Sequence, residues 1–397
     1  MIRHNASPFR WLVLAVFVLS TAINMLDRAT LAALAPAIAA EFHLSHEQYG
    51  WVTAAFNLPY ALSAPFAGLL IDGLGLNRAI TIAVALWSCA GIGTGLTRGL
   101  GGLAGCRAVL GVAEAAGIPG AGKAIHQYLR PEERALGNGV NQAGVSLGMM
   151  LAPLLATAIA VRSGWRAAFL VTGALGLLWI PVWSWTARSS GSLPAPKQHP
   201  GADAAMLRDQ RLWIFVVANA LSMMGYFLWF NFTQLFLVEA HRLTLQQAAA
   251  YAWIPPVLAA AGGFAGGWLS LRLVRRGAPA PAARFRVCLT ASVLALAGAA
   301  IPAANTPLVA TAGISLSIFA VAAFSVNMYT LPLDVFGAAP AAFAISILVA
   351  SYGAISAAIG PVFGAIIDRH GYSPVILGVA VTPLAASGVL WITRSTR

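Results

Sequence analysis

Four charged side chains lie deep inside long apolar stretches of the sequence: Asp27, Arg28, Arg107 and Glu114. If those stretches cross a membrane, each charge costs about 2.5–3.5 kcal/mol even on a lenient insertion scale, so each should face a cavity and have a partner. The fork of an arginine matches a carboxylate through two hydrogen bonds and keeps its charge. Two such arginines predict a binding site for an organic anion. A buried carboxyl group predicts a proton carrier, because burial favours its neutral form.

The spacing of these four residues indicates how they are arranged. Neighbouring residues of a helix point about 100° apart, so Asp27 and Arg28 cannot face the same way. Arg107 and Glu114 are almost two turns apart, so they share one helix face, and Arg107 and Arg28 could lie at similar depths. The alternative is that Asp27–Arg107 or Arg28–Glu114 are ion pairs that only hold two helices together. Buried ion pairs stabilise poorly compared with apolar packing, which favours a functional reason for these charges.

Single polar residues in other apolar stretches could add hydrogen bonds to a polar ligand. Such residues usually bond a neighbouring membrane helix or the backbone, so each also has a purely structural interpretation. The candidates are Tyr60, Asn141, Gln142, Tyr226, Asn231, Gln234, Asn327, Ser351 and Tyr352.

Two partial motifs do not predict chemistry. The stretch from Gly117 to Lys123 is close to a phosphate-binding loop, but Ala124 replaces the metal-binding hydroxyl and no strand precedes it, so it is predicted to be a glycine-rich helix end. His46-Glu47 begins like a zinc-protease motif that has no second histidine. The three cysteines show no metal-binding spacing. We therefore expect no catalytic residue, no metal and no cofactor other than a coupling proton. The outer loop, predicted to be solvated, contains Glu41, His43, His46 and Glu47.

The elements that must position these residues are membrane-spanning helices. Of 397 residues, 59% are apolar and only 9% are charged, whereas soluble proteins carry about 25% charged residues. A spanning helix needs about 20 apolar residues. Twelve stretches qualify, and the lipid bilayer is their expected surrounding. They are 11–38, 49–71, 79–97, 100–123, 135–160, 166–187, 212–238, 246–271, 285–303, 307–332, 340–366 and 373–393.

The twelve predicted spans divide into two equal sets. Residues 1–187 and 212–397 are each predicted to form a six-helix bundle, joined by a polar cytoplasmic linker at 188–211. Phe66-Ala67-Gly68 recurs as Phe264-Ala265-Gly266, although so short a match can arise by chance. The pattern predicts an all-α membrane protein of two pseudo-symmetric bundles around a central site.

Basic residues indicate the orientation in the membrane. With the N-terminus inside, seventeen Lys and Arg residues fall on the cytoplasmic side and five on the outer side. This bias predicts that both termini are cytoplasmic. It also accounts for the net charge of +12 through contact with anionic lipid headgroups, without any nucleic acid.

A loop between the second and third spans resembles the signature of the major facilitator superfamily. It contains Gly68, Asp72, Gly75 and Arg78 at the spacing of that signature. The resemblance implies that these residues latch helix ends in one state of a transport cycle. The second copy is degenerate, with Ser270 in place of the aspartate. Between the last two spans, Asp368-Arg369-x-Gly371 resembles a related element of the superfamily.

Further motifs resemble the anion:cation symporter family, and within it the bacterial hexuronate and related sugar-acid transporters. They are Leu26-Asp27-Arg28-Ala29-Thr30, Arg107-x6-Glu114-Ala115, Pro131-Glu132-Glu133-Arg134-Ala135, Leu207-Arg208-Asp209-x-x-Leu212-Trp213 and Asp334-Val335-Phe336-Gly337. The resemblance implies proton-driven uptake of a carboxylate across a bacterial inner membrane by a monomer. It implies that Arg28 binds the carboxylate, that Tyr60 contacts substrate, and that Asp27 and Glu114 take part in proton coupling.

Departures from that family leave alternatives open. Val145 and Ala64 stand where some members have polar residues, which could mean a smaller or less hydroxylated acid. The alternatives are a small monocarboxylate or aromatic-acid transporter, or an organic-anion exchanger or efflux carrier. Ala152-Pro153 stands in place of the Gly-Pro pair typical of antiporters, which argues against a drug-efflux carrier. A membrane enzyme or sensor is not expected, because no nucleophile–base pair and no effector domain occur.

Overall fold

The computed structural model describes residues 9–189 and 204–395. Within these ranges the chain is helical, and no β-strand occurs. Twelve of the described helical stretches are long and apolar enough to cross a membrane. The predicted all-α, twelve-span membrane fold is therefore confirmed. Residues 190–203, most of the predicted linker, lie outside the described residues.

Each predicted span corresponds to one helix or to two consecutive helical segments. The first six spans are α1 (Phe9–Phe42), α2 (His46–Leu74), α3 (Leu76–Gly95), α4 (Leu100–Glu114) with α5 (Gly117–Tyr128), α6 (Arg134–Ser163) and α7 (Trp165–Ser189). The last six are α8 (Gln210–Ala240), α9 (Leu245–Ala252) with α10 (Ile254–Arg275), α11 (Ala280–Ala295) with the 3-10 segment Leu296–Ala303, α12 (Pro307–Met328) with α13 (Leu331–Phe336), α14 (Ala338–His370) and α15 (Tyr372–Ser395).

Local sequence explains where the helices begin and end. Ser45 starts α2 with a capping box, because its side chain accepts from the Gln48 N–H and the Gln48 side chain accepts from the Ser45 N–H. Gly75 is the single residue between α2 and α3 and has a φ of 78°. That left-handed conformation favours glycine, which explains the Gly75 of the signature loop. The glycine-rich stretch that resembled a phosphate loop is helical, as part of α5.

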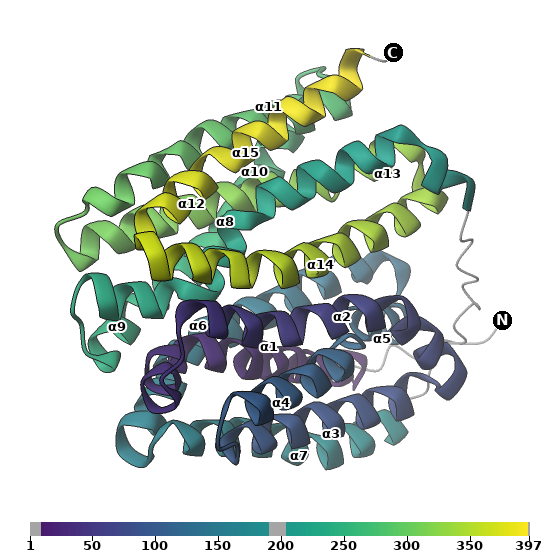
Figure 1. Ribbon diagram of the computed structural model, residues 1–397. Helices are drawn as coiled ribbons and strands as arrows, with labels where there is room; N and C mark the ends of the chain where they lie inside the picture. The colour runs from purple at the N-terminus through teal and green to yellow at the C-terminus, as the bar shows by residue number, and fades with distance from the viewer. Residues whose placement is uncertain (1–8, 190–203, 396–397) are drawn as a thin grey trace.

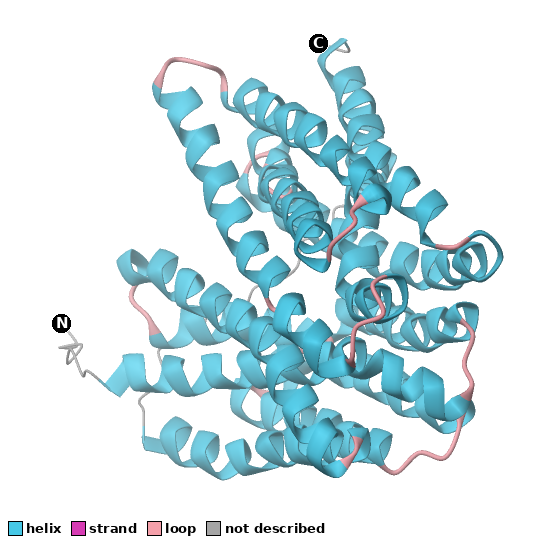
Figure 2. Cartoon of the chain, turned by 90° about the vertical axis from the view of Figure 1, so that its left-hand side faces the viewer, coloured by secondary structure: helices cyan, strands magenta, loops and turns pink. Residues whose placement is uncertain are grey.

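The helices form two bundles that lie against each other (Figure 1, and turned by 90° in Figure 2). The first bundle comprises α1 to α7, and the second comprises α8 to α15. Across the interface, α2 packs against α14, α1 against α8, and α6 against α9 and α10. The interface between the bundles therefore contains helices from both sequence halves.

The bundles meet closely at one end only. A Cβ atom on Gly364 would lie 2.1 Å from the His46 carbonyl oxygen, and one on Gly353 would lie 2.8 Å from the Ala61 Cβ. The first contact joins the start of α2 to the last part of α14, and the second joins the middles of the two helices. Further along α2, a Cβ atom on Gly68 would meet no atom within 4 Å. We call the end where α2 begins the closed end, and the end where α2 finishes, near the start of α1, the open end (Figure 1).

The prediction that the outer loop is solvated is wrong for one of its four residues, the half-buried His46, whereas Glu41 is exposed although it is bonded. Glu41 accepts hydrogen bonds from Trp165 Nε1 and from Arg166 Nη1, both at 2.6 Å. His46 contacts Asp368 Oδ1 at 2.7 Å. Their partners are more than 100 residues away in the sequence, so the local pattern could not reveal them. The side chains of His43 and Glu47 are exposed, as predicted.

Candidate functional site

A central cavity lies between the two bundles and contains both buried arginines. Its volume is about 130 Å³. Arg28 reaches it from α1 and Arg107 from α4. The rest of its wall combines polar side chains with aromatic and aliphatic ones. The polar members other than the arginines are Thr53, Asn57, Tyr226, Asn231 and Tyr352, and the apolar members are Met25, Leu31, Phe56, Val145, Met149, Phe227 and Phe230.

Arg28 forms an ion pair with Glu114 at the edge of this cavity. Arg28 Nε and Nη2 both donate to Glu114 Oε2, at 2.9 and 2.8 Å. The guanidinium carbon also lies 4.7 Å from the ring centroid of Phe56 and 4.9 Å from that of Tyr60. The Glu114 side chain is fully buried, whereas 21% of the Arg28 side chain is exposed. The Nε and Nη2 donors of the guanidinium therefore bond Glu114, while the Arg28 side chain also borders the cavity.

Arg107 has no such ion pair within the described residues. The residue is 2% exposed, and its Nε is buried without a hydrogen-bond partner there. Its guanidinium carbon lies 5.8 Å from the ring centroid of Phe169. A buried charge without a bonded partner is costly, so this cation favours the arrival of an anion in the cavity.

Asp27 points away from the cavity into the first bundle. It is 2% exposed, and neither carboxyl oxygen has a hydrogen-bond partner among the residues that the structure describes. One oxygen lies 4.0 Å from the place that a Cβ atom on Gly91 of α3 would take. Asp27 and Arg28 thus face different surroundings, as their adjacency on a helix requires. The two predicted coupling acids differ in position, because only Glu114 contacts an arginine of the cavity.

The other predicted ligand residues are spread more widely. Asn231 lines the cavity, and its Nδ2 donates to the Phe227 carbonyl at 2.9 Å. Tyr60 is stacked on Phe56 beneath Arg28, so it supports the arginine and is not itself part of the lining. Tyr226 and Tyr352 belong to the wall.

Three more of the predicted ligand residues lie away from the cavity wall. Asn327 is fully buried, and its amide donates to the carbonyls of Gly266 and Ala323 at 3.2 and 2.9 Å, which ties α12 to α10. Ser351 donates to the Leu348 carbonyl of its own helix at 2.8 Å. Gln142 is exposed on α6. The positions of these three residues fit the structural interpretation that single polar residues in membrane helices often have.

The sequence patterns did not identify the two polar residues that α2 contributes to the cavity wall. Thr53 and Asn57 both line the cavity. They are four residues apart, and the Asn57 Nδ2 donates to the Thr53 carbonyl at 2.9 Å. Two polar residues at this spacing share a helix face, which is the signal that could have identified them.

The signature loop forms its contacts inside the first bundle. Asp72 pairs with Lys123 of α5, and Lys123 also lies 3.4 Å from the Ile71 carbonyl oxygen. Gly68 has open space around its Cα, and Arg78 is exposed. At the corresponding place in the second bundle, Arg284 donates to Ser270 Oγ at 2.6 Å and to Asp334 Oδ2 at 3.1 Å. Each cluster thus holds its own bundle together at the open end.

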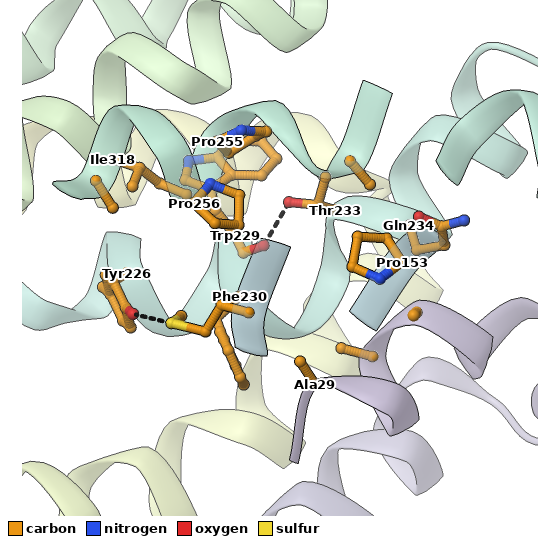
Figure 3. A pocket seen from close by; sticks show the side chains of 15 residues that line it. Ala29, Pro153, Tyr226, Trp229, Phe230, Thr233, Gln234, Pro255, Pro256 and Ile318 are labelled. Carbon is orange, nitrogen blue, oxygen red and sulfur yellow. Dashed lines mark hydrogen bonds between the residues drawn. The ribbon is translucent and has the colours of Figure 1, made fainter. Parts of the chain in front are cut away.

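A second pocket adjoins the central cavity on the side of α8, α10 and α6 (Figure 3). It shares Met149, Tyr226 and Phe230 with the cavity, and the Tyr226 hydroxyl lies 3.7 Å from the Met149 sulfur. The remaining wall is mostly apolar. It contains Ala29, Ala32, Ala33, Pro153, Trp229, Thr233, Gln234, Ala252, Pro255, Pro256, Ala259 and Ile318. No arginine is among the described residues that line it, so both arginines predicted to bind an anion border the central cavity and not this pocket.

Comparisons with known proteins agree with this architecture. The chain is 30% identical over 402 residues to the hexuronate transporter of Escherichia coli (strain K12), covering 96% of this chain and 93% of that protein. It is 30% identical over 281 residues to the galacturonate transporter of Dickeya chrysanthemi, covering 66% of this chain and 81% of that protein. The fold is similar to a bacterial homolog of the human lysosomal transporter Spinster in an inward-facing, unoccupied conformation. That comparison has a TM-score of 0.82 at 21% identity and covers 99% of this chain and 98% of the other.

These matches confirm the resemblance drawn from the motifs and agree with a transporter, not an enzyme. The family model described as Major Facilitator Superfamily matches residues 17–361, which is most of the chain. The chain therefore belongs to the Major Facilitator Superfamily.

Proposed function

We propose that the protein imports a sugar acid, such as a hexuronate or an aldonate, together with a proton. The observation that carries the proposal is that Arg28 and Arg107 border one cavity between the two bundles, with Glu114 bonded to Arg28. The hexuronate and galacturonate transporters among the relatives support the substrate class. The polar wall residues are suited to bonding several hydroxyl groups.

The excess of basic residues on one side supports a location in the bacterial inner membrane with both termini cytoplasmic. In that orientation the open end faces the cytoplasm and the closed end faces outward. The structure then corresponds to the stage at which substrate leaves toward the cytoplasm.

The charges of the site supply a reason for coupling substrate to a proton. Arg28 and Arg107 balance Asp27 and Glu114 when both acids are ionised. A substrate carboxylate adds one negative charge in a place where uncompensated charge is costly. A proton on one of the two acids restores the balance, so anion and proton bind more tightly together than apart.

Glu114 is the better placed of the two acids to carry that proton. When ionised, it occupies the Nε and Nη2 donors of Arg28. Once protonated, it holds the guanidinium less strongly, because the Coulomb attraction between the two opposite charges is lost. Arg28 is then available for the carboxylate of the substrate. Asp27 contacts neither arginine through a hydrogen bond within the described residues, so any effect it has is indirect.

Transport by purified protein in liposomes tests the coupling. Glu114→Gln mimics the protonated acid, so it should keep exchange of internal for external substrate and lose accumulation driven by an inward proton gradient. Asp27→Asn in the same assay tests the other acid. If Glu114→Gln accumulates substrate under a proton gradient as well as the parent does, Glu114 is not the proton carrier.

An aromatic acid is the second candidate substrate. The pocket beside the cavity presents Trp229, Phe230 and Tyr226, which could hold an aromatic ring (Figure 3). A thermal-shift screen of the purified protein against hexuronates, aldonates, lactate and aromatic acids separates the candidates. Stabilisation by aromatic acids alone would replace the sugar-acid assignment.

A further inference from the structure

The closed end holds a cluster of titratable side chains that the proposed transport mechanism does not use. His46 begins α2 in the first bundle. The other members come from the second bundle: Glu239 near the end of α8, Asp368 near the end of α14, and Tyr372 at the start of α15. The cluster lies where the two bundles come closest, so its bonds join one bundle to the other.

Asp368 completes the start of a helix that belongs to the other bundle. Its Oδ1 accepts from the backbone N–H of His46 and its Oδ2 from that of Glu47, both at 2.9 Å. The first N–H groups of a helix have no partner inside the helix, and an anion is favourable beside them. The Ser45 side chain already bonds the Gln48 N–H, so Asp368 supplies two of the remaining partners. These bonds must break whenever the closed end opens.

The imidazole of His46 lies between two carboxylates of the second bundle. Its Nδ1 is 2.7 Å from Asp368 Oδ1, and its Nε2 is 2.8 Å from Glu239 Oε2 and 3.1 Å from the Tyr372 hydroxyl. A neutral imidazole carries one N–H and can donate to one carboxylate only, while its other nitrogen then turns a lone pair toward the second carboxylate. The protonated ring donates to both. The carboxylate of Glu47, on the same helix, is exposed and makes no bond to this ring.

Glycines permit the close approach on which the cluster depends. A Cβ atom on Gly364 would lie 2.1 Å from the His46 carbonyl oxygen, and one on Gly50 would lie 2.3 Å from the Gly360 carbonyl oxygen. Real Cβ atoms do not approach backbone atoms so closely, so a methyl group there forces α2 and α14 apart. This packing is independent of the polar bonds and favours the same closed arrangement.

We propose that His46 and Asp368 form a latch that holds the two bundles together at the closed end, and that the latch is complete only when His46 is protonated. Its formation favours the state closed at this end, and its loss favours the state open there. A proton arriving from this side of the membrane would therefore help to close the protein behind its substrate.

Distances between spin labels at the closed end test the latch. The three native cysteines are first replaced by serine, and labels are placed at Arg98 and Asn305, which are exposed in closed-end loops of the first and second bundles. Asp368→Asn should raise the ratio of long to short distances by roughly tenfold, the effect expected for losing one charge-assisted hydrogen bond. Glu47→Gln removes the same charge one residue from His46 and should leave the ratio unchanged. Equal ratios in these two variants would refute the latch.

Two further comparisons test the protonation of His46 and the packing. In the parent, the long-distance fraction should rise as the pH is raised, and His46→Gln should remove this response while leaving Asp368 its backbone bonds. A response that survives in His46→Gln would belong to other groups and would overturn the role of His46. Gly364→Ala should raise the fraction at every pH, whereas Gly378→Ala, where a Cβ meets open space, should not. Because these measurements need no substrate, their outcome is independent of the transport proposal.

Discussion

Replacing Arg28 by alanine separates a substrate-binding role from a purely structural one. The change leaves the fully buried carboxylate of Glu114 without the donors that now bond it at 2.8 and 2.9 Å. Removing one partner of a buried ion pair destabilises a protein by about 3–5 kcal/mol. We therefore expect Arg28→Ala to lower the thermal midpoint of the purified protein clearly.

The double variant Arg28→Ala/Glu114→Gln removes this complication. It contains no unpaired charge at this place, so it should recover most of the lost stability. Substrate binding should stay lost in both variants. Losing two charge-assisted hydrogen bonds between Arg28 and the substrate carboxylate, of about 1.5–3 kcal/mol each, should raise the Kd by about 100-fold or more. Arg28→Lys should recover little affinity, because an ammonium group cannot form the bidentate pair.

The assay combines thermal unfolding with calorimetric titration of galacturonate into the parent, the single variant, the double variant and Glu114→Gln. The diagnostic result is a double variant that is as stable as the parent and does not bind. A double variant that is stable and binds galacturonate with parental affinity would show that Arg28 only holds helices together. The carboxylate site would then have to be built on Arg107.

Three other perturbations have expected outcomes. Arg107→Gln removes a cation that has no ion-pair partner within the described residues, so it should fold normally and raise the Kd for galacturonate by about tenfold or more in the same titration. Gly75→Ala places a side chain at a φ of 78° and should cost about 1–3 kcal/mol of stability. Gly73→Ala, two residues earlier in the last turn of α2 with open space around it, should cost much less, and equal melting points would contradict this. Asp209→Ala removes the cap of α8 and should cost about 1 kcal/mol at neutral pH. The hydrogen bond from Arg211 lowers the pKa of Asp209 from its ordinary value of 3.8. The stabilisation by the cap is therefore present above pH 3.8 and is lost as the pH falls through the lowered pKa. A difference in stability between variant and parent that persists below the lowered pKa would refute the assignment.

The class of protein and the number of spans could be predicted from the sequence alone. Apolar content and the length of each apolar run are local properties, and a membrane requires every span to satisfy its own backbone hydrogen bonds. The predicted span 49–71 therefore lies inside α2 (His46–Leu74), and 212–238 lies inside α8 (Gln210–Ala240). The depth of Arg28 and Glu114 was also visible, because a charge inside an apolar run stands out.

Which side chains meet depends on how the helices pack, and the sequence did not show this. The sequence left open whether Glu114 would pair with Arg28, and Asn327 was as good a ligand candidate as Asn231. Lipid and protein interior are both apolar, so a membrane helix shows little difference between its faces, and its rotation about its own axis cannot be read from the pattern. The contact between His46 and Asp368 joins residues 322 positions apart. It exists because two separate bundles close on each other, and nothing local to either residue specifies that approach.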